Sequence, residues 1–258
     1  MSQSIVALIP ARGGSVRVPR KNLASLNGKP LIVWTILAAQ HADIFSGIYV
    51  STEDEEIAAV SRQYGATVID RPAELAADLA PDIGWVTHAL MHITVTSARD
   101  IADARKPDAF ALLRCTSPFR SPETIRAAWD HLQHHGSYAV DSLRAVEPCK
   151  QHPFKMWREC GEFIAPFYEL VGISASMDSA PPHSMPTQAH TRLLAQNASL
   201  EMAWSRVVLS DQPATISGSR VLPWRMAGYE GVDINGTDDL EFARWLVETG
   251  RATLAEAG

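Results

Sequence analysis

Four cationic side chains near the start of the chain could together bind an anion. Arg12, Arg17, Arg20 and Lys21 share one short stretch. Like charges this close repel one another unless something negative lies among them. A triphosphate would meet that need. The alternative is a solvated basic loop with no ligand.

Two adjacent glycines, Gly13 and Gly14, lie within the same stretch. Glycine adopts positive φ angles readily and lets backbone N–H groups approach a ligand closely. The apolar run 5–9 before them has the composition of a buried strand, and Pro10 ends the run. The loop would therefore lie at the carboxyl end of a first strand, where open α/β sheets bind ligands. Neither the Walker A motif nor Gly-x-Gly-x-x-Gly is present.

Bulk composition excludes several classes of protein. The chain has 258 residues and a net charge of −6, which argues against a general nucleic-acid binder. No apolar run approaches the roughly 20 residues of a membrane span, so no membrane association is expected. The first residues do not resemble a secretory signal. Three cysteines without a Cys-x-x-Cys pair predict a reduced, cytoplasmic protein.

Short apolar runs alternate with helical patterns along most of the chain. This alternation predicts an α/β fold with a doubly wound, mostly parallel, Rossmann-like sheet and helices on both faces. Thr52 and Glu55 are expected to form a capping box at the second helix, and Gly65 to end that helix. The predicted strands are 5–9, 48–51, 67–69, 109–113, 138–143 and 200–204; the predicted helices are 30–40, 52–64, 81–98, 121–134 and 238–248.

The alternation breaks in the segment 144–195. This segment is rich in proline, histidine, methionine and aromatic residues and lacks sustained helical periodicity. A long irregular stretch inside a compact chain usually has a function or mediates an interaction. We therefore expect residues 1–258 to form a single domain that carries 144–195 as an inserted arm.

Three further motifs occur in a fixed order with the first loop. Arg71-Pro72 follows the third predicted strand, Thr116-Ser117-Pro118 and Arg120 follow the fourth, and Asp233 lies before the last helix. Together with the stretch 10–22 they resemble the motifs of the CMP-sialic acid synthetases (acylneuraminate cytidylyltransferases), in the sugar nucleotidyltransferase superfamily. That family activates nine-carbon sugar acids with CTP.

The resemblance implies roles for the nucleotide-binding residues. Arg12, Lys21 and Asp233 would be catalytic, and Asn22 and Arg71 would recognise the base. Val16 stands where the family has a phosphate-facing lysine. The full set implied to bind the nucleotide is Ala11, Gly13, Gly14, Ser15, Arg17, Asn22 and Arg71.

The resemblance also implies an acceptor site formed by Arg114, Thr116, Ser117, Lys155 and Asn197. The family has a sugar-contacting glutamine at the position of Arg114. A guanidinium adds charge and a bidentate partner for a carboxylate, which favours an acceptor with a different pattern of acid or acyl groups. Legionaminic, pseudaminic and Kdo-type acids are the related acceptors that this leaves open.

A magnesium ion and a second subunit complete the implied enzyme. Asp233 and Asn235 would hold Mg²⁺, which prefers oxygen ligands and keeps several waters; the family has a second aspartate where this chain has Asn235. The segment 144–195 would pack on the partner in a homodimer and help to close the partner's sugar pocket. The substrates implied are CTP and a small acidic sugar.

Two alternatives remain at this point. One is a nucleotidyltransferase for a non-sialic acceptor such as another sugar acid or a phosphonate. The other is a catalytically impaired nucleotide-binding homologue, because Val16 and Asn235 both depart from the family pattern. The sequence also leaves CTP and GTP open.

Overall fold

The computed structural model describes residues 3–14, 18–96, 106–172 and 180–255. The chain forms two compact units, one of residues 1–145 and 197–258 and the other of residues 146–196. None of the described helices is both long enough and apolar enough to cross a bilayer.

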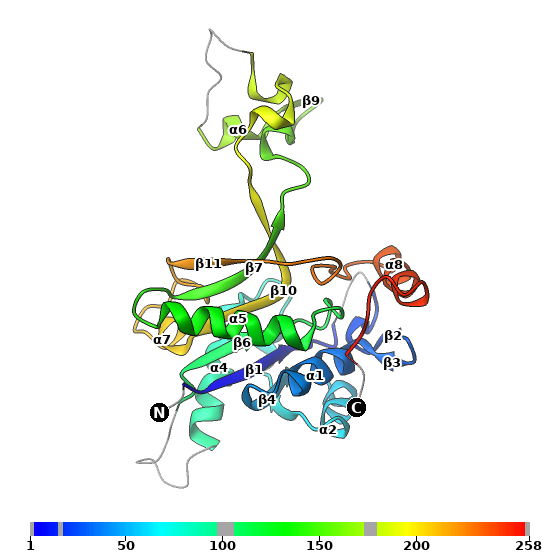
Figure 1. The fold of residues 1–258 in the computed structure, drawn as a ribbon, viewed down its shortest axis with the longest axis vertical. Coiled ribbons are helices and arrows are strands. Elements are labelled where there is room, and N and C mark those ends of the chain that lie inside the picture. Colours follow the sequence, from blue (N-terminus) through cyan, green and yellow to red (C-terminus); the bar gives the residue numbers. More distant parts are fainter. Residues whose placement is uncertain (1–2, 15–17, 97–105, 173–179, 256–258) are drawn as a thin grey trace. The chain divides into compact units, whose positions relative to one another are not determined.

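A seven-stranded sheet forms the centre of the first unit, with the order β11-β7-β10-β6-β1-β4-β5 (Figure 1). β1 pairs in parallel with β4 and β6, β4 pairs in parallel with β5, and β10 runs antiparallel to β6. This confirms the predicted doubly wound, mostly parallel sheet. The strands are β1 (Ile5–Pro10), β4 (Phe45–Thr52), β5 (Thr67–Asp70), β6 (Ala109–Leu112), β7 (Ser142–Pro148), β10 (Leu194–Trp204) and β11 (Val221–Arg225).

Both faces of this sheet are covered by helices. In β1, Ile5, Ala7 and Ile9 join one buried cluster, whereas Val6 and Leu8 join another, as expected for a strand buried on both faces. The first cluster includes side chains of α1 (Leu31–Ala42), α2 (Glu55–Gln63), α5 (Pro122–His135) and α8 (Thr237–Glu248), and the second includes those of α4 (Asp82–Thr96) and α7 (Ser205–Val208).

A small hairpin, β2 (Ser25–Leu26) and β3 (Lys29–Pro30), precedes α1 and was not predicted as a pair of strands. Its turn residues Asn27 and Gly28 both have positive φ, 49° and 79°, as a type I′ turn requires. α1 begins at Leu31, one residue after Pro30.

Two local predictions were wrong. The cap of α2 is Asp54, whose side chain accepts from the N–H of Ile57, while Thr52 accepts from the N–H of Asp54. The strand predicted at 138–143 begins only at Ser142, because the chain turns back after α5 with hydrogen bonds from residues 139 and 140 to the carbonyl of Gly136.

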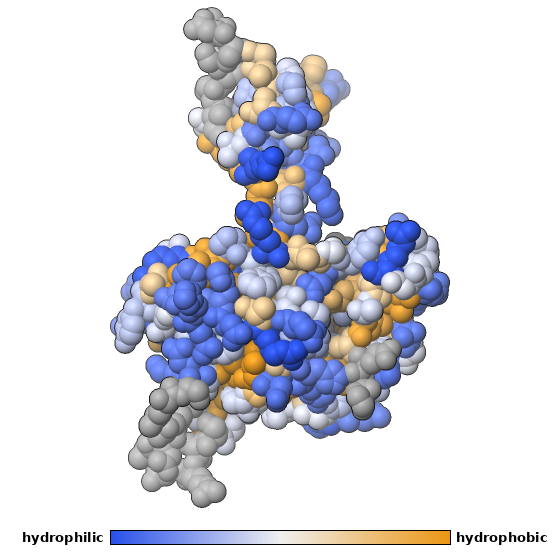
Figure 2. Space-filling view, in the orientation of Figure 1, coloured by the Kyte–Doolittle hydropathy of each residue, from blue (hydrophilic) through white to orange (hydrophobic). Residues whose placement is uncertain are grey.

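The second unit is small and irregular. It contains β8 (Trp157–Cys160) paired with β9 (Phe163–Pro166), helix α6 (Phe167–Leu170) and the 3₁₀ turns η3 (Pro153–Lys155), η4 (Pro182–Ser184) and η5 (Thr187–Ala189). Tyr168 is buried and contacts the rings of Phe154 and His183. By contrast, Phe163 and Ile164 are 76% and 61% exposed, and Figure 2 shows hydrophobic residues at the surface of this unit. Its bounds lie close to those of the segment 144–195.

Candidate functional site

A cavity of about 350 Å³ opens in the first unit where β1 and β6 end. These strands are neighbours, yet the chain continues from β1 towards β4 on one side and from β6 towards the opposite side. Open α/β sheets bind ligands at such a switch point. The lining includes Pro10 at the end of β1 and Arg12, Lys21 and Asn22 after it. It also includes Arg71, Leu75, Asp78, Asp82 and Trp85 after β5, Arg114, Cys115 and Thr116 after β6, and Asp233 and Asn235 before α8.

Arg12 lies in this cavity and is held by the segment after α3 (Ala73–Ala76). Its Nη1 donates to the carbonyls of Ala76 and Ala77, at 3.0 and 2.9 Å, and to Asp78 Oδ1 at 3.2 Å. Three acceptors on one nitrogen fix the guanidinium while leaving Nη2 and Nε to other partners. Arg12 thus joins the first loop to the loop after β5.

The two glycines of the first loop differ. The N–H of Gly13 donates to Glu53 Oε1 at 2.8 Å, and a Cβ at position 13 would lie 2.5 Å from Asp54 Oδ2, so only glycine fits without a shift. Gly14 is exposed with open space around it. Ala11 is buried, and its N–H donates to Ser51 O. The predicted nucleotide ligands Ser15 and Arg17, with Val16, lie outside the described residues.

Lys21 and Asn22 begin the short turn η1 (Lys21–Leu23) and line the cavity. Lys21 Nζ donates to Ile234 O at 2.9 Å, and buried Asn22 donates through Nδ2 to Arg12 O at 2.9 Å. The bond from Lys21 ties the first loop to the segment that carries Asp233, and the bond from Asn22 closes the loop on itself. Arg20 instead forms ion pairs with Asp54 and Glu56 at the start of α2 and is not a lining residue.

Arg71 is buried, with 6% of its surface exposed. Its Nε and Nη2 donate to the hydroxyl and carbonyl of Ser51 at 3.0 and 2.9 Å, and its guanidinium lies over the Trp85 ring at 4.8 Å. Burial lowers the pKa of Arg71 to about 10, so the side chain stays cationic at neutral pH.

Arg114 forms a short ion pair with Asp82 at the first residue of α4. Arg114 Nη2 lies 2.6 Å from Asp82 Oδ2, and Asp82 Oδ1 accepts from Trp85 Nε1 at 2.8 Å. Burial by itself disfavours the charged form of Asp82, but Arg114 and the two hydrogen bonds outweigh it and hold the pKa of Asp82 below its usual value. The Asp82 carboxylate is therefore charged at neutral pH.

The structure brings only some of the predicted acceptor residues to the cavity. Arg114 and Thr116 line it. Ser117 is fully buried and Asn197 accepts from the N–H of Ser199; neither is a lining residue. Lys155 belongs to the second unit, where its Nζ donates to the carbonyls of residues 183 and 185.

Asp233 offers an oxygen that suits a hard cation. Its Oδ2 accepts from Asn235 Nδ2 at 2.7 Å, whereas its Oδ1 is buried and has no hydrogen-bond partner among the described residues. A carboxylate oxygen without a protein partner, on a residue that lines the cavity, fits Mg²⁺, which takes one or two carboxylates and several waters. Asn235 orients this carboxylate. No cluster of three His, Cys, Asp or Glu side chains that could hold a metal occurs among the residues described.

Among the lining residues missed in the sequence, three are charged or aromatic: Asp78, Asp82 and Trp85. Asp82 follows Pro81 and opens a helix, so in the sequence it looks like an ordinary acidic residue of a first helical turn. No periodicity marks it as a partner of Arg114, which lies far away in the sequence.

The fold and site define the class: a doubly wound α/β protein with a cation-lined cavity at the switch point of its sheet. A family model described as cytidylyltransferase matches residues 6–156, more than half of the chain. The chain belongs to the cytidylyltransferase family, as the motifs led us to expect.

Individual relatives agree with this assignment. A CMP-N,N′-diacetyllegionaminic acid synthase of Legionella pneumophila is 45% identical over 125 residues, 48% of this chain and 51% of that protein. An N-acylneuraminate cytidylyltransferase of Escherichia coli is 39% identical over 125 residues, 48% of this chain and 27% of that protein. The match thus spans about half the length of these relatives or less.

A solved structure shows the same fold at low sequence identity. The structure of a CMP:2-keto-3-deoxy-manno-octonic acid synthetase complexed with CTP has a TM-score of 0.63 and 15% identity, and the match covers 96% of this chain and all of that one. The likeness extends the fold assignment beyond residue 156, where the family match ends.

Proposed function

We propose that this protein transfers CMP from CTP to a nine-carbon or related 2-keto sugar acid and releases pyrophosphate. The observation that carries the proposal is the cavity at the switch point, where Arg12, Lys21, Arg71 and Arg114 converge in a chain of the cytidylyltransferase family. Four cations in one cavity suit a polyanionic substrate. The names of the relatives supply the acceptor class.

In the proposed reaction, the anomeric hydroxyl oxygen of the acid forms a bond to the α-phosphorus of CTP. The bond from that phosphorus to the bridging oxygen breaks, pyrophosphate leaves with the bonding electrons, and the hydroxyl proton passes to solvent. Such transfer asks the protein mainly for positioning and charge stabilisation. Arg12 and Lys21, which both line the cavity, would hold the phosphates together with Ser15 and Arg17.

The base would lie beside Arg71. Apolar residues of the lining come from the segment that follows Arg71, namely Leu75, Ala77, Ala80 and Trp85. A flat heteroaromatic ring needs apolar walls and a few polar groups at its edge. The fixed guanidinium of Arg71 offers donors to carbonyl and ring-nitrogen acceptors of cytosine.

Asp233 would hold Mg²⁺ through its unpartnered Oδ1, with Asn235 keeping the carboxylate in place. The ion would neutralise charge on the departing pyrophosphate. Thr116 O accepts from the N–H of Ile234 at 2.8 Å, so the backbone next to Asp233 is anchored to the end of β6.

We also propose a homodimer formed through the second unit. The support is its exposed apolar surface, with Trp157, Phe163, Ile164 and Leu170 between 45% and 76% exposed, since contiguous exposed apolar residues mark interfaces. Lys155 would act on the acceptor from this unit. Sedimentation equilibrium with Phe163→Ser and Ile164→Ser would test the dimer. A cytoplasmic location stays a prediction from the cysteine content.

The test of function measures nucleotide binding and turnover separately. Thermal shifts with CTP, GTP, UTP and ATP plus Mg²⁺ report binding, and pyrophosphate release reports transfer to N-acetylneuraminic, N,N′-diacetyllegionaminic and 2-keto-3-deoxy-manno-octonic acids. We expect CTP to stabilise the protein most and at least one acid to release pyrophosphate. Stabilisation by CTP without pyrophosphate release from any acid would favour a nucleotide-binding homologue that has lost catalysis. Stabilisation by GTP alone would mean that GTP, and not CTP, is the nucleotide donor.

A further inference from the structure

The ion pair between Arg114 and Asp82 places a fixed arginine at the end of β6. Asp82 is itself fixed, because its other oxygen accepts from the indole of Trp85, whose surface is only 2% exposed. The Arg114 and Asp82 side chains are 29% and 36% exposed and both line the cavity. The buried Trp85 indole thus fixes the Asp82 carboxylate, and this carboxylate in turn fixes the Arg114 guanidinium.

Asp82 also decides where Arg114 can point. Arg12, Lys21 and Arg71 already line the same cavity, and a fourth cation there would be attracted toward bound phosphates. The contact with Asp82 at 2.6 Å opposes that pull. A guanidinium carries five N–H donors, so the donors not facing Asp82 remain for a second partner.

We propose that Asp82 is a positioning residue for the acceptor, which holds Arg114 so that its other N–H groups bind a carboxylate or acyl oxygen of the sugar acid rather than the phosphates of the nucleotide. This inference rests on the proposed function. It makes acceptor choice a property of the pair, so that the residue at position 114 cannot be interpreted without the residue at position 82.

A double-mutant cycle tests the inference. Asp82→Asn, Arg114→Gln and the double variant are compared with the wild-type protein by steady-state kinetics, with KM measured separately for CTP and for the acid. Loss of one charge-assisted hydrogen bond corresponds to about a tenfold effect or more. We expect Asp82→Asn to raise the acceptor KM by about tenfold, with kcat and the CTP KM changed less than about threefold. In the Arg114→Gln background the same substitution should have almost no further effect.

Two further variants serve as an independent test and as a control. Trp85→Phe keeps the ring beneath Arg71 but removes the Nε1 donor, so it should raise the acceptor KM by about threefold in the wild-type background only; it also serves if Asp82→Asn does not fold. Glu74→Gln removes an exposed carboxylate on α3 that does not line the cavity, and it should leave both KM values unchanged. Circular dichroism checks the fold of each variant.

The outcomes separate the inference from the proposed function. If wild-type protein turns over an acid but Asp82→Asn raises its KM equally with Arg114 or Gln at position 114, Asp82 does not act through Arg114 and the inference is wrong. If Asp82→Asn raises the KM for CTP instead, the pair belongs to the nucleotide site. If wild-type protein turns over no acid with any nucleotide, the proposed function fails and the inference fails with it.

Discussion

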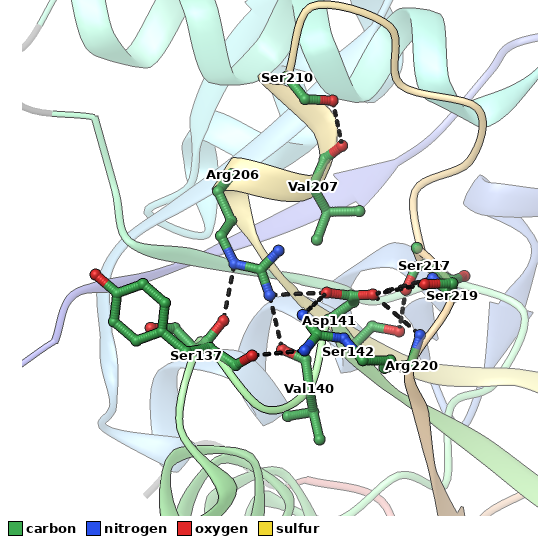
Figure 3. A network of polar contacts seen from close by, with 12 residues as sticks. Ser137, Val140, Asp141, Ser142, Arg206, Val207, Ser210, Ser217, Ser219 and Arg220 are labelled. Carbon is green, nitrogen blue, oxygen red and sulfur yellow. Dashed lines mark hydrogen bonds and ion pairs between the residues drawn. The ribbon is translucent and has the colours of Figure 1, made fainter.

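Replacement of Asp141 should destabilise the first unit by an amount that depends on the substituent. Asp141 lies just before β7 and joins three segments that are distant in the sequence (Figure 3). Its Oδ1 accepts from Arg206 Nη2 and Arg220 Nη2, both at 2.8 Å, and its Oδ2 accepts from the backbone N–H groups of Ser219 and Arg220, both at 3.0 Å. A Cβ on Gly218 would lie 2.6 Å from the Asp141 side chain, so the backbone at Gly218 packs closely against this side chain.

The contacts fix the expected magnitudes. In Asp141→Asn the remaining oxygen can serve the two backbone N–H groups, while the new NH₂ faces two arginines that are 41% and 49% exposed and stay hydrated. Exposed ion pairs contribute about 0.2–1 kcal/mol each, so we expect a loss of about 0.4–2 kcal/mol. Asp141→Ala also loses the two backbone hydrogen bonds, at about 1 kcal/mol each, for a total of about 2.4–4 kcal/mol.

Urea unfolding followed by tryptophan fluorescence measures these differences. Asp211→Asn is the matched control, because Asp211 is exposed and has no hydrogen bond or ion pair among the described residues; we expect a change within about 0.5 kcal/mol. Equal losses for Asp141→Asn and Asp141→Ala, or losses no larger than that of the control, would refute the reasoning.

The same contacts predict a pH dependence. Hydrogen bonds from Arg220, together with those from Arg206 and the backbone N–H groups, hold the pKa of Asp141 far below its usual value despite partial burial. A lowered pKa gives stability that is present above the unfolded-state pKa of about 3.9 and is lost as the pH falls below it. The difference between wild-type protein and Asp141→Asn should therefore stay constant between pH 7 and pH 5 and shrink as the pH falls below about 4.

Two further predictions concern the cavity. Lys21→Ala should lower kcat by about 10²–10³-fold if its ammonium faces the triphosphate, with an unchanged circular dichroism spectrum; near-normal turnover with CTP would remove Lys21 from the proposed mechanism. Cys115 lines the cavity but is 1% exposed, and burial raises its pKa to about 12. Because the thiolate is the reactive form, Cys115 should react with a thiol reagent at pH 7.5 much more slowly than the two partly exposed cysteines, and mass spectrometry of the labelled peptides checks the order.

The α/β fold could be predicted because its signals are local. The run 5–9 is apolar at every position, and β1 is indeed buried on both faces; Ser121 and Pro122 signal the start of α5, where the Ser121 side chain caps the helix. The failures came where two local signals competed. Thr52 and Asp54 both have the chemistry of a cap, and the residue that caps the helix is Asp54, which also pairs with Arg20.

The candidate site was predictable only in part. The motifs predicted five residues that the structure places in one cavity: Arg12, Lys21, Asn22, Arg71 and Asp233. These residues lie together because each follows one of the neighbouring strands or lies in a segment anchored to such a strand. The partners of these residues were not predictable, since nothing in the sequence says that Arg12 lies on α3's last carbonyls or that Arg114 faces Asp82. Such contacts depend on loop conformation, which motifs and periodicity in a single sequence do not reveal.

The insertion between β7 and β10 has a consequence for how the sheet responds to changes in its length. The two strands are hydrogen-bonded neighbours in the sheet, and next to them the N–H of Cys149 donates to Leu193 O at 3.0 Å. An insert whose two ends meet in this way closes like a hairpin, so its length adds little to the cost of closing the chain. A change in the length of this insert should therefore leave the register of the sheet and the cavity at the end of β1 as they are.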